Sequence, residues 1–208
     1  MSDERTSVAD REIVRDEESR AELLTPDEAR DLITSASHRA PTGIRNRALV
    51  VMMYRAGLRP GEALALGFDD VDLESGTIRV PARKGGVSRT IGVDDGSADV
   101  LRRWAGRREA QGIDPSAPFF CTLSGETLKA AYVRELLPRL ARKAGIAKRV
   151  HPLSLRYTCA SEMAAEGLPT ALIEKHLGVA VSGSARRYLR SFTDDEVIAA
   201  AQEREWRL

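Results

Sequence analysis

Hydrophobic side chains recur at intervals of three and four residues over most of the chain, which is the period of an α-helix packed on one face. The first helix is predicted to begin at Thr25-Pro26-Asp27-Glu28, which offers a side-chain cap, a proline in the first turn and a capping-box glutamate. A second should run from Ile44 to Arg55 and end before Gly57. Further helices are predicted at 100–107, 128–142, 155–166 and 169–176, and a last one, capped by Thr193 and Glu196, at the C-terminus.

The hydrophobic period changes to two within residues 71–93. Ile78 and Ile91 each alternate with polar neighbours, and turn-forming residues occupy 74–76 and 85–86. Such alternation is typical of half-buried strands joined by short hairpins. The predicted fold class is therefore mainly α, with one small three-stranded antiparallel β-sheet.

A length of 208 residues, 42% of them hydrophobic and 30% charged, suits one domain with a short appendage. Residues 1–22 are polar and are expected to form a flexible charged leader, with a single domain over 23–208. The longest apolar run, Ala48–Tyr54, is far shorter than a membrane span, so we expect a cytoplasmic protein without a membrane partner. Cys121 and Cys159 lack metal-site spacing and are expected to be buried free thiols.

The net charge of +1 conceals an uneven distribution along the chain. Residues 1–32 hold 11 acidic and 5 basic residues, whereas residues 139–190 hold ten Lys or Arg against three Glu. A polyanionic partner would suit the basic stretch, and a solvated basic face explains it equally well.

One segment places an arginine at the start of a helix. In Tyr54-Arg55-Ala56-Gly57-Leu58-Arg59-Pro60-Gly61-Glu62, Gly57 should end one helix and Pro60 should begin the next. Arg59 is then held at a helix N-terminus, where anions are favoured, and its guanidinium can bind a phosphate through two hydrogen bonds. A structural arginine between two helices would give the same pattern.

A longer pattern lies near the C-terminus. It comprises His151-Pro152-Leu153-Ser154-Leu155-Arg156-Tyr157-Thr158, then Leu177-Gly178-Val179, and Tyr188 nine residues after Val179. Together with the Arg59 segment, this order and spacing resemble the two signature boxes of tyrosine recombinases (phage integrases). The resemblance covers roughly Leu24 to Leu208 and implies a fold like the catalytic domain of that family.

The resemblance implies a set of catalytic residues. Arg59 and Arg156 match the two arginines that clamp the non-bridging phosphate oxygens, and Tyr188 matches the nucleophile that forms a 3′-phosphotyrosyl link. Lys84, in the hairpin Arg83-Lys84-Gly85-Gly86, matches the lysine that protonates the departing 5′ oxygen, although an isolated surface lysine would look the same. Double-stranded DNA and self-association on DNA are the implied partners. No metal, cofactor or small-molecule substrate is expected.

The sequence departs from the family pattern at two positions. Leu153 and Val179 stand where the family has histidines, and neither side chain can form hydrogen bonds or carry a proton. His151 could reach the same phosphate if its loop shifts, or it could be an ordinary surface residue. Tyr157 is expected to be a structural aromatic on a helix face, and His176 a helix-terminal residue whose charge favours the helix dipole.

Family members usually carry a separate helical core-binding domain before the catalytic one, and we expect none here because fewer than 30 residues precede the domain. Two principal functions are consistent with these observations. The first is a recombinase that cuts and rejoins DNA, slowed by the loss of two histidines. The second is a catalytically degenerate DNA-binding regulator or accessory subunit with the same fold. A helical interaction protein with no nucleic-acid role fits the retained arginines less well.

Overall fold

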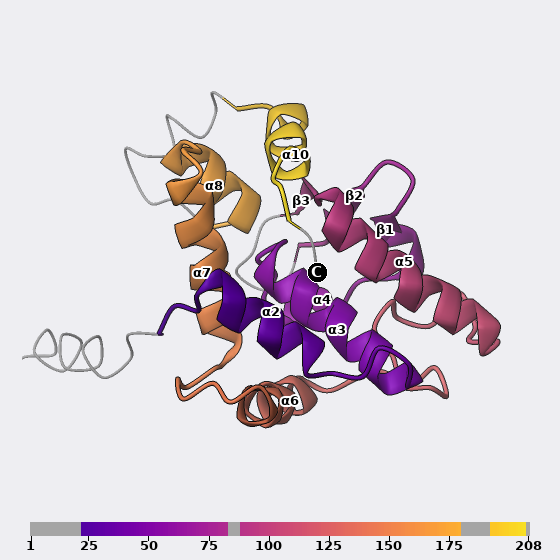
Figure 1. The fold of residues 1–208 in the computed structure, drawn as a ribbon. Helices are drawn as coiled ribbons and strands as arrows, with labels where there is room; N and C mark the ends of the chain where they lie inside the picture. The colour runs from indigo at the N-terminus through magenta and orange to yellow at the C-terminus, as the bar shows by residue number, and fades with distance from the viewer. Residues whose placement is uncertain (1–21, 83–87, 180–191, 207–208) are drawn as a thin grey trace, which may run out of the picture.

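The computed structural model describes residues 22–82, 88–179 and 192–206, and within them the chain is mostly helical with one small sheet (Figure 1). The helices are α2 Pro26–Thr34, α3 Pro41–Tyr54, α4 Pro60–Ala63, α5 Asp95–Ala110, α6 Ala130–Lys143, α7 Pro152–Ala165, α8 Thr170–Leu177 and α10 Asp194–Gln202, with a 3-10 turn η1 at Phe68–Asp70. The strands are β1 Val71–Asp72, β2 Thr77–Val80 and β3 Arg89–Gly92. They pair antiparallel in the order β1-β2-β3, which confirms the predicted meander.

Helix α3 forms the centre of the domain. Residues 48–54 are all buried, so this helix is apolar around its whole circumference rather than on one face. It packs against α2, α5 and α7, which surround it in Figure 1. The segment that precedes the candidate Arg59 is therefore held rigidly by the core.

The predicted helix ends are confirmed where a side-chain cap specifies them. Thr25 accepts a hydrogen bond from the N–H of Glu28 at 3.1 Å, and Thr193 accepts one from the N–H of Glu196 at 3.2 Å. Three helices begin earlier than predicted, and the first of them, α3, starts at Pro41 rather than Ile44. Helix α5 starts at Asp95 because the Asp94 carboxylate accepts the N–H of Ser97 at 2.9 Å. Helix α7 starts at Pro152, so the beginning of the second signature box is helical.

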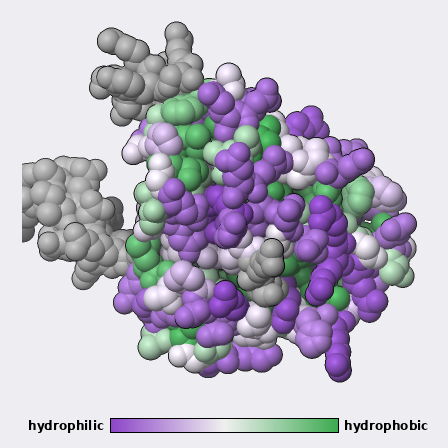
Figure 2. Space-filling model, turned by 45° about the horizontal axis from the view of Figure 1, so that its top comes forward, coloured by the Kyte–Doolittle hydropathy of each residue, from purple (hydrophilic) through white to green (hydrophobic). Residues whose placement is uncertain are grey.

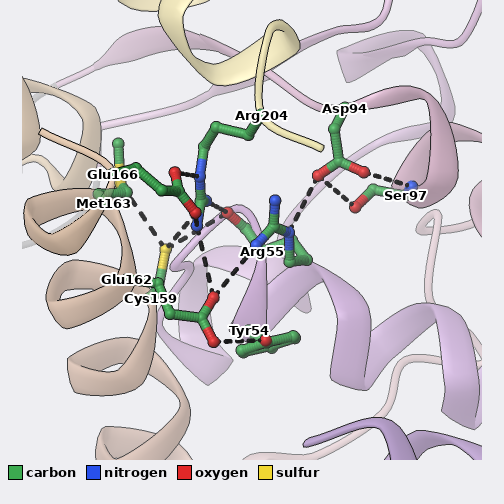
Figure 3. Close-up of polar contacts among 9 residues, drawn as sticks. All are labelled: Tyr54, Arg55, Asp94, Ser97, Cys159, Glu162, Met163, Glu166 and Arg204. Atoms are coloured by element: carbon green, nitrogen blue, oxygen red, sulfur yellow. Dashed lines mark hydrogen bonds and ion pairs between the residues drawn. The ribbon is translucent and has the colours of Figure 1, made fainter. Parts of the chain in front are cut away.

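The C-terminal part of the described chain packs back on the domain. Helix α10 lies against β3 and α8, and the residues after it reach a buried polar cluster (Figure 3). There Arg204 contacts Glu162 and Glu166 of α7, while Arg55 contacts Glu162 and Asp94. This cluster therefore joins the end of α3 to α7, α5 and the C-terminal segment.

The surface in the view of Figure 2 is mainly hydrophilic, with smaller hydrophobic patches between the polar residues. Within the described ranges, none of the helices has the length and apolar character needed to cross a membrane. Cys121 and Cys159 are both buried and free, as predicted.

Candidate active site

The turn between α3 and α4 brings the two signature boxes into contact. Gly57 adopts a φ of 63°, and the N–H of Leu58 bonds the carbonyl of Met52 at 3.2 Å, which closes the end of α3. A Cβ atom on Gly57 would lie 2.4 Å from a methyl carbon of Leu177, so only glycine fits here. The Gly57 carbonyl accepts a hydrogen bond from Nη1 of Arg156 at 2.6 Å.

The carboxylate of Glu62 holds three arginines together. Its Oε2 accepts the backbone N–H of Arg59 at 2.8 Å, and its Oε1 lies 3.3 Å from Nη1 of Arg59. Arg89 of β3 donates to both oxygens, at 3.0 and 3.2 Å. Nη1 of Arg156 lies 3.9 Å from Oε2. The structure thus places Arg59 and Arg156 around one carboxylate, although nearly a hundred residues separate them in sequence.

Burial and mutual charge determine the ionisation of this cluster. Burial and the nearby charge of Arg59 lower the pKa of Arg156 to about 10, so its guanidinium is still protonated at neutral pH. Burial alone would raise the pKa of Glu62, but the hydrogen bonds from Arg89 and the Arg59 N–H, with the charges of Arg89 and Arg156, bring it below its ordinary value. Three cations around one carboxylate leave an excess of positive charge, which favours an anion.

The two arginines differ in their accessibility. The Arg59 side chain is 46% exposed, whereas that of Arg156 is 5% exposed and also donates to the Leu177 carbonyl at 2.5 Å. Two of the five N–H donors of Arg156 are used by backbone carbonyls. An incoming phosphate would meet Arg59 first and could then contact the remaining donors of Arg156.

A comparison with protein families identifies this arrangement. The model described as "Phage integrase family" matches residues 22–194 of the chain. The chain belongs to the phage integrase family. Its family and fold are those of tyrosine recombinases, and this is consistent with a role in site-specific DNA recombination.

Several characterised integrase-family proteins are similar to this chain. It is 29% identical over 161 residues to the type 1 fimbriae regulatory protein FimE of Escherichia coli K12, covering 77% of this chain and 81% of FimE. It is 33% identical over 141 residues to the tyrosine recombinase XerC of Xylella fastidiosa strain M23, covering 68% of this chain and 46% of that protein. The chain thus spans most of FimE but about half of XerC.

Solved structures show the same fold. The crystal structure of the XerA recombinase has a TM-score of 0.70 and 27% identity, over 82% of this chain and 64% of that one. The XerH recombinase bound to its difH substrate has a TM-score of 0.65 and 24% identity, over 80% of this chain and 49% of that one. The predicted fold class is therefore confirmed.

The two residues that replace family histidines are accessible at the surface of this integrase-family chain. Leu153, in the first turn of α7, is 43% exposed, and Val179, just after α8, is 40% exposed. Tyr157, one turn after Leu153, is 47% exposed and is a helix-face aromatic that faces solvent rather than the core. The two positions at which the sequence pattern predicts family histidines therefore carry accessible apolar side chains.

His151 is the N-cap residue of α7. Its Nδ1 accepts the backbone N–H of Leu153 at 3.3 Å, which gives the imidazole a structural role at the helix start. Burial and the charge of Arg149 lower its pKa. A neutral ring with its proton on Nε2 satisfies this geometry, and that tautomer still leaves a donor directed away from the cap.

His176 does not have the helix-dipole role expected for it. Its ring is fully buried, and burial together with the charges of Arg204 and Arg89 lowers its pKa to about 3, so it carries no charge to favour the dipole. A contact with the Ala56 backbone partly offsets this shift, but that contact does not have the geometry of a hydrogen bond, and neither ring nitrogen has another partner. The sequence correctly placed His176 near the end of a helix, but the protonation state of its ring depends on burial beside arginines from other elements.

Replacing His176 by leucine should stabilise the protein by about 1–3 kcal/mol at neutral pH, because it removes buried polar atoms without partners. The gain should grow on acidification. Below pH 6.5 the unfolded histidine binds a proton while the folded one does so only near pH 3, so the native chain loses stability across that window. Urea unfolding at several pH values measures this. His38→Leu, at an exposed histidine, is the control. If the free energy of unfolding of His176→Leu falls between pH 6.5 and pH 3 as much as that of the native chain, the prediction is wrong.

The remaining two predicted catalytic residues, Lys84 and Tyr188, lie outside the described residues. Lys84 lies in the sequence between Val80 and Arg89, the paired residues that end β2 and begin β3. Tyr188 follows Leu177, the last residue of α8, by eleven positions. Their roles stay predictions from the family pattern.

Two residues of the cluster were missed as site residues by sequence reasoning. Glu62 follows Arg59 within the first box, where a glutamate is part of the family pattern, but nothing local shows that it contacts Arg156. Arg89 shares a strand face with Ile91, which is buried. A charged residue on the inward face of a strand is the signal that could have identified it.

Proposed function

We propose that this chain cleaves and rejoins DNA strands as a site-specific tyrosine recombinase. The observation that carries the proposal is the convergence of Arg59 and Arg156 on one cluster with excess positive charge, at the two positions where the family has its phosphate-binding arginines. Fixed guanidinium groups stabilise the additional negative charge of a pentacovalent phosphorane. The structures of XerH bound to its difH substrate and of the Tn1549 integrase in complex with DNA support DNA as the substrate of this chain.

In the proposed reaction, the Tyr188 hydroxyl oxygen attacks the phosphorus and the bond from phosphorus to the 5′ oxygen breaks. Lys84 gives a proton to the departing 5′ oxygen, and the phenol proton passes to water. Arg59 and Arg156 hold the non-bridging oxygens throughout. Attack of a 5′ hydroxyl on the phosphotyrosyl link reverses these steps and rejoins a strand. Recombinase partners are further copies of the chain assembled on DNA.

The experiment that tests this function uses a DNA duplex with a nick beside the scissile phosphate, so that the cleaved fragment diffuses away. A denaturing gel then reveals any covalent complex of protein and DNA. We expect the native chain to form such a complex slowly, and Tyr188→Phe to form none while binding DNA nearly as well. Absence of any complex with the native chain on its own target site would count against the enzyme.

A second candidate function is a DNA-binding regulator or accessory subunit without strand cleavage. The exposed Leu153 and Val179 favour it, because neither can assist proton transfer. Its relative FimE is described as a regulatory protein. This candidate predicts DNA binding without any covalent complex.

DNA binding should depend steeply on salt and on the basic stretch 139–190. Arg139 and Arg142 are exposed on α6. We expect Arg139→Gln with Arg142→Gln to weaken DNA binding. The slope of the logarithm of the binding constant against the logarithm of the salt concentration should fall in magnitude by about one for each phosphate that is no longer neutralised. Arg102→Gln with Arg103→Gln on α5 is the matched control. Fluorescence anisotropy at several salt concentrations measures both. Equal losses of DNA affinity in the two double variants would argue against a localised DNA surface. Removal of residues 1–22 should not weaken DNA binding.

A further inference from the structure

Arg89 occupies a position where three parts of the candidate site meet. It is the first residue of β3, five positions after Lys84 in the sequence, and its side chain is 6% exposed. Its Nη1 and Nη2 donate to the two oxygens of Glu62, and its Nε donates to the carbonyl of His176 at 2.8 Å. One planar guanidinium therefore links β3 to α4 and to the C-terminal end of α8.

The end of α8 is shaped to admit this guanidinium. Gly178 has a φ of 62°, and a Cβ atom there would lie 2.6 Å from Nη1 of Arg89. The last carbonyls of α8 accept hydrogen bonds from two arginines, because Arg156 bonds the Leu177 carbonyl while Arg89 bonds that of His176. The positive groups also suit the negative end of the helix dipole.

We propose that Arg89 is a positioning residue of this active site, which fixes Glu62 and the end of α8 so that Arg59 is held relative to Arg156. The inference rests on the proposed strand-transfer function. Through Glu62, Arg89 orients both the backbone N–H and the guanidinium of Arg59. Through the His176 carbonyl, it fixes the end of α8, where the neighbouring Leu177 carbonyl accepts a hydrogen bond from Arg156.

Lysine cannot replace Arg89 in this role. A single ammonium group cannot span both Glu62 oxygens and the His176 carbonyl in one plane. Arg89→Lys keeps the charge, so binding of DNA should change little. Misplacement of catalytic groups by about 1 Å can cost about 100-fold in rate, so we expect cleavage to slow by about 10- to 100-fold.

The test is single-turnover cleavage of the nicked duplex, with DNA affinity measured separately in the Tyr188→Phe background. Arg89→Lys should slow cleavage about 10- to 100-fold and change Kd less than about threefold. The matched control is Arg79→Lys on the adjacent strand, an arginine whose side chain is 68% exposed, and it should leave the rate unchanged. A native rate in Arg89→Lys, or a parallel loss of rate, affinity and melting temperature, would overturn the positioning role.

A double-mutant cycle with Glu62→Gln separates positioning from general destabilisation. If Arg89 acts through Glu62, the rate loss from Arg89→Lys should shrink severalfold in the Glu62→Gln background. If the losses of cleavage rate from the two substitutions are independent and additive, Arg89 does not act through Glu62.

Hydrogen exchange gives a readout that does not depend on cleavage. In Arg89→Lys, amides at 58–62 and 174–179 should exchange at least about tenfold faster, while those of α2 stay unchanged. If the native chain forms no covalent complex, the proposed function fails, and exchange alone decides whether Arg89 holds these segments. Unchanged exchange in both segments would overturn the inference even in an active recombinase.

Discussion

Replacing Leu153 and Val179 by histidine together is expected to raise the rate of covalent-complex formation by about 100-fold or more. A positioned acid or base is typically worth about 10² to 10⁴ in rate, and a single stabilising donor about 10² to 10³. The native chain lacks both groups but has the arginines, and we expect its slow cleavage to reflect that loss. The nicked duplex and a denaturing gel measure the rate in each variant.

The exposure of the two positions makes this experiment informative. Since Leu153 and Val179 are 43% and 40% exposed, an introduced imidazole stays in contact with water. The cost of burying a polar ring should therefore be small. Leu123→His, at another exposed leucine, controls for adding a histidine, and melting temperature confirms folding.

Two outcomes would change the interpretation of the missing histidines. If the native chain already cleaves at a rate typical of recombinases, His151 becomes the best substitute, and His151→Ala should abolish the activity. If a well-folded double-histidine variant forms no complex, the non-enzymatic regulator becomes the better conclusion.

Removing the Arg204 guanidinium should destabilise the protein by about 3 kcal/mol. Arg204, whose side chain is 3% exposed, donates to both oxygens of Glu166 at 2.5 and 3.1 Å and to the Arg55 carbonyl at 3.3 Å (Figure 3). Arg204→Met leaves Glu162 with one fewer cation and separates the C-terminal segment from α7. Urea unfolding and a melting temperature lower by roughly 6–12 °C should reveal the loss.

The matched control for Arg204→Met is Arg102→Met. Arg102 forms an exposed ion pair with Asp99 on α5, with side chains 47% and 72% exposed, so its loss should cost less than about 1 kcal/mol. Similar effects of the two substitutions would show that the cluster in Figure 3 contributes no more than a surface pair.

Local sequence chemistry predicted the parts of the fold that neighbouring residues determine. Thr25 and Thr193 specified their helix starts because a hydroxyl and a glutamate three residues later satisfy the free N–H groups. The start of α5 was missed because the aspartates, glycine and serine at 94–97 are also typical turn residues. At that position the same four residues suit a helix cap and a turn equally well, and only the packing of the helix decides between them.

The candidate site was predictable only where a pattern of neighbouring residues specifies its members. The spacing of the two boxes identified Arg59 and Arg156, and the structure brings them together. The bonds of Arg89 to Glu62 and to α8 join residues that no local pattern relates. The pKa of His176 likewise results from burial beside arginines contributed by other elements, which its place near a helix end could not show.

The way the chain enters the domain has a consequence for labelling. The Glu22 carboxylate accepts the N–H of Arg149 at 3.0 Å, Lys148 donates to the Leu23 carbonyl at 2.9 Å, and the Leu24 N–H bonds the Thr158 hydroxyl at 3.0 Å. Residue 22 itself therefore lies beside the loop that precedes α7. A small dye attached at that residue would report on the surroundings of the second signature box.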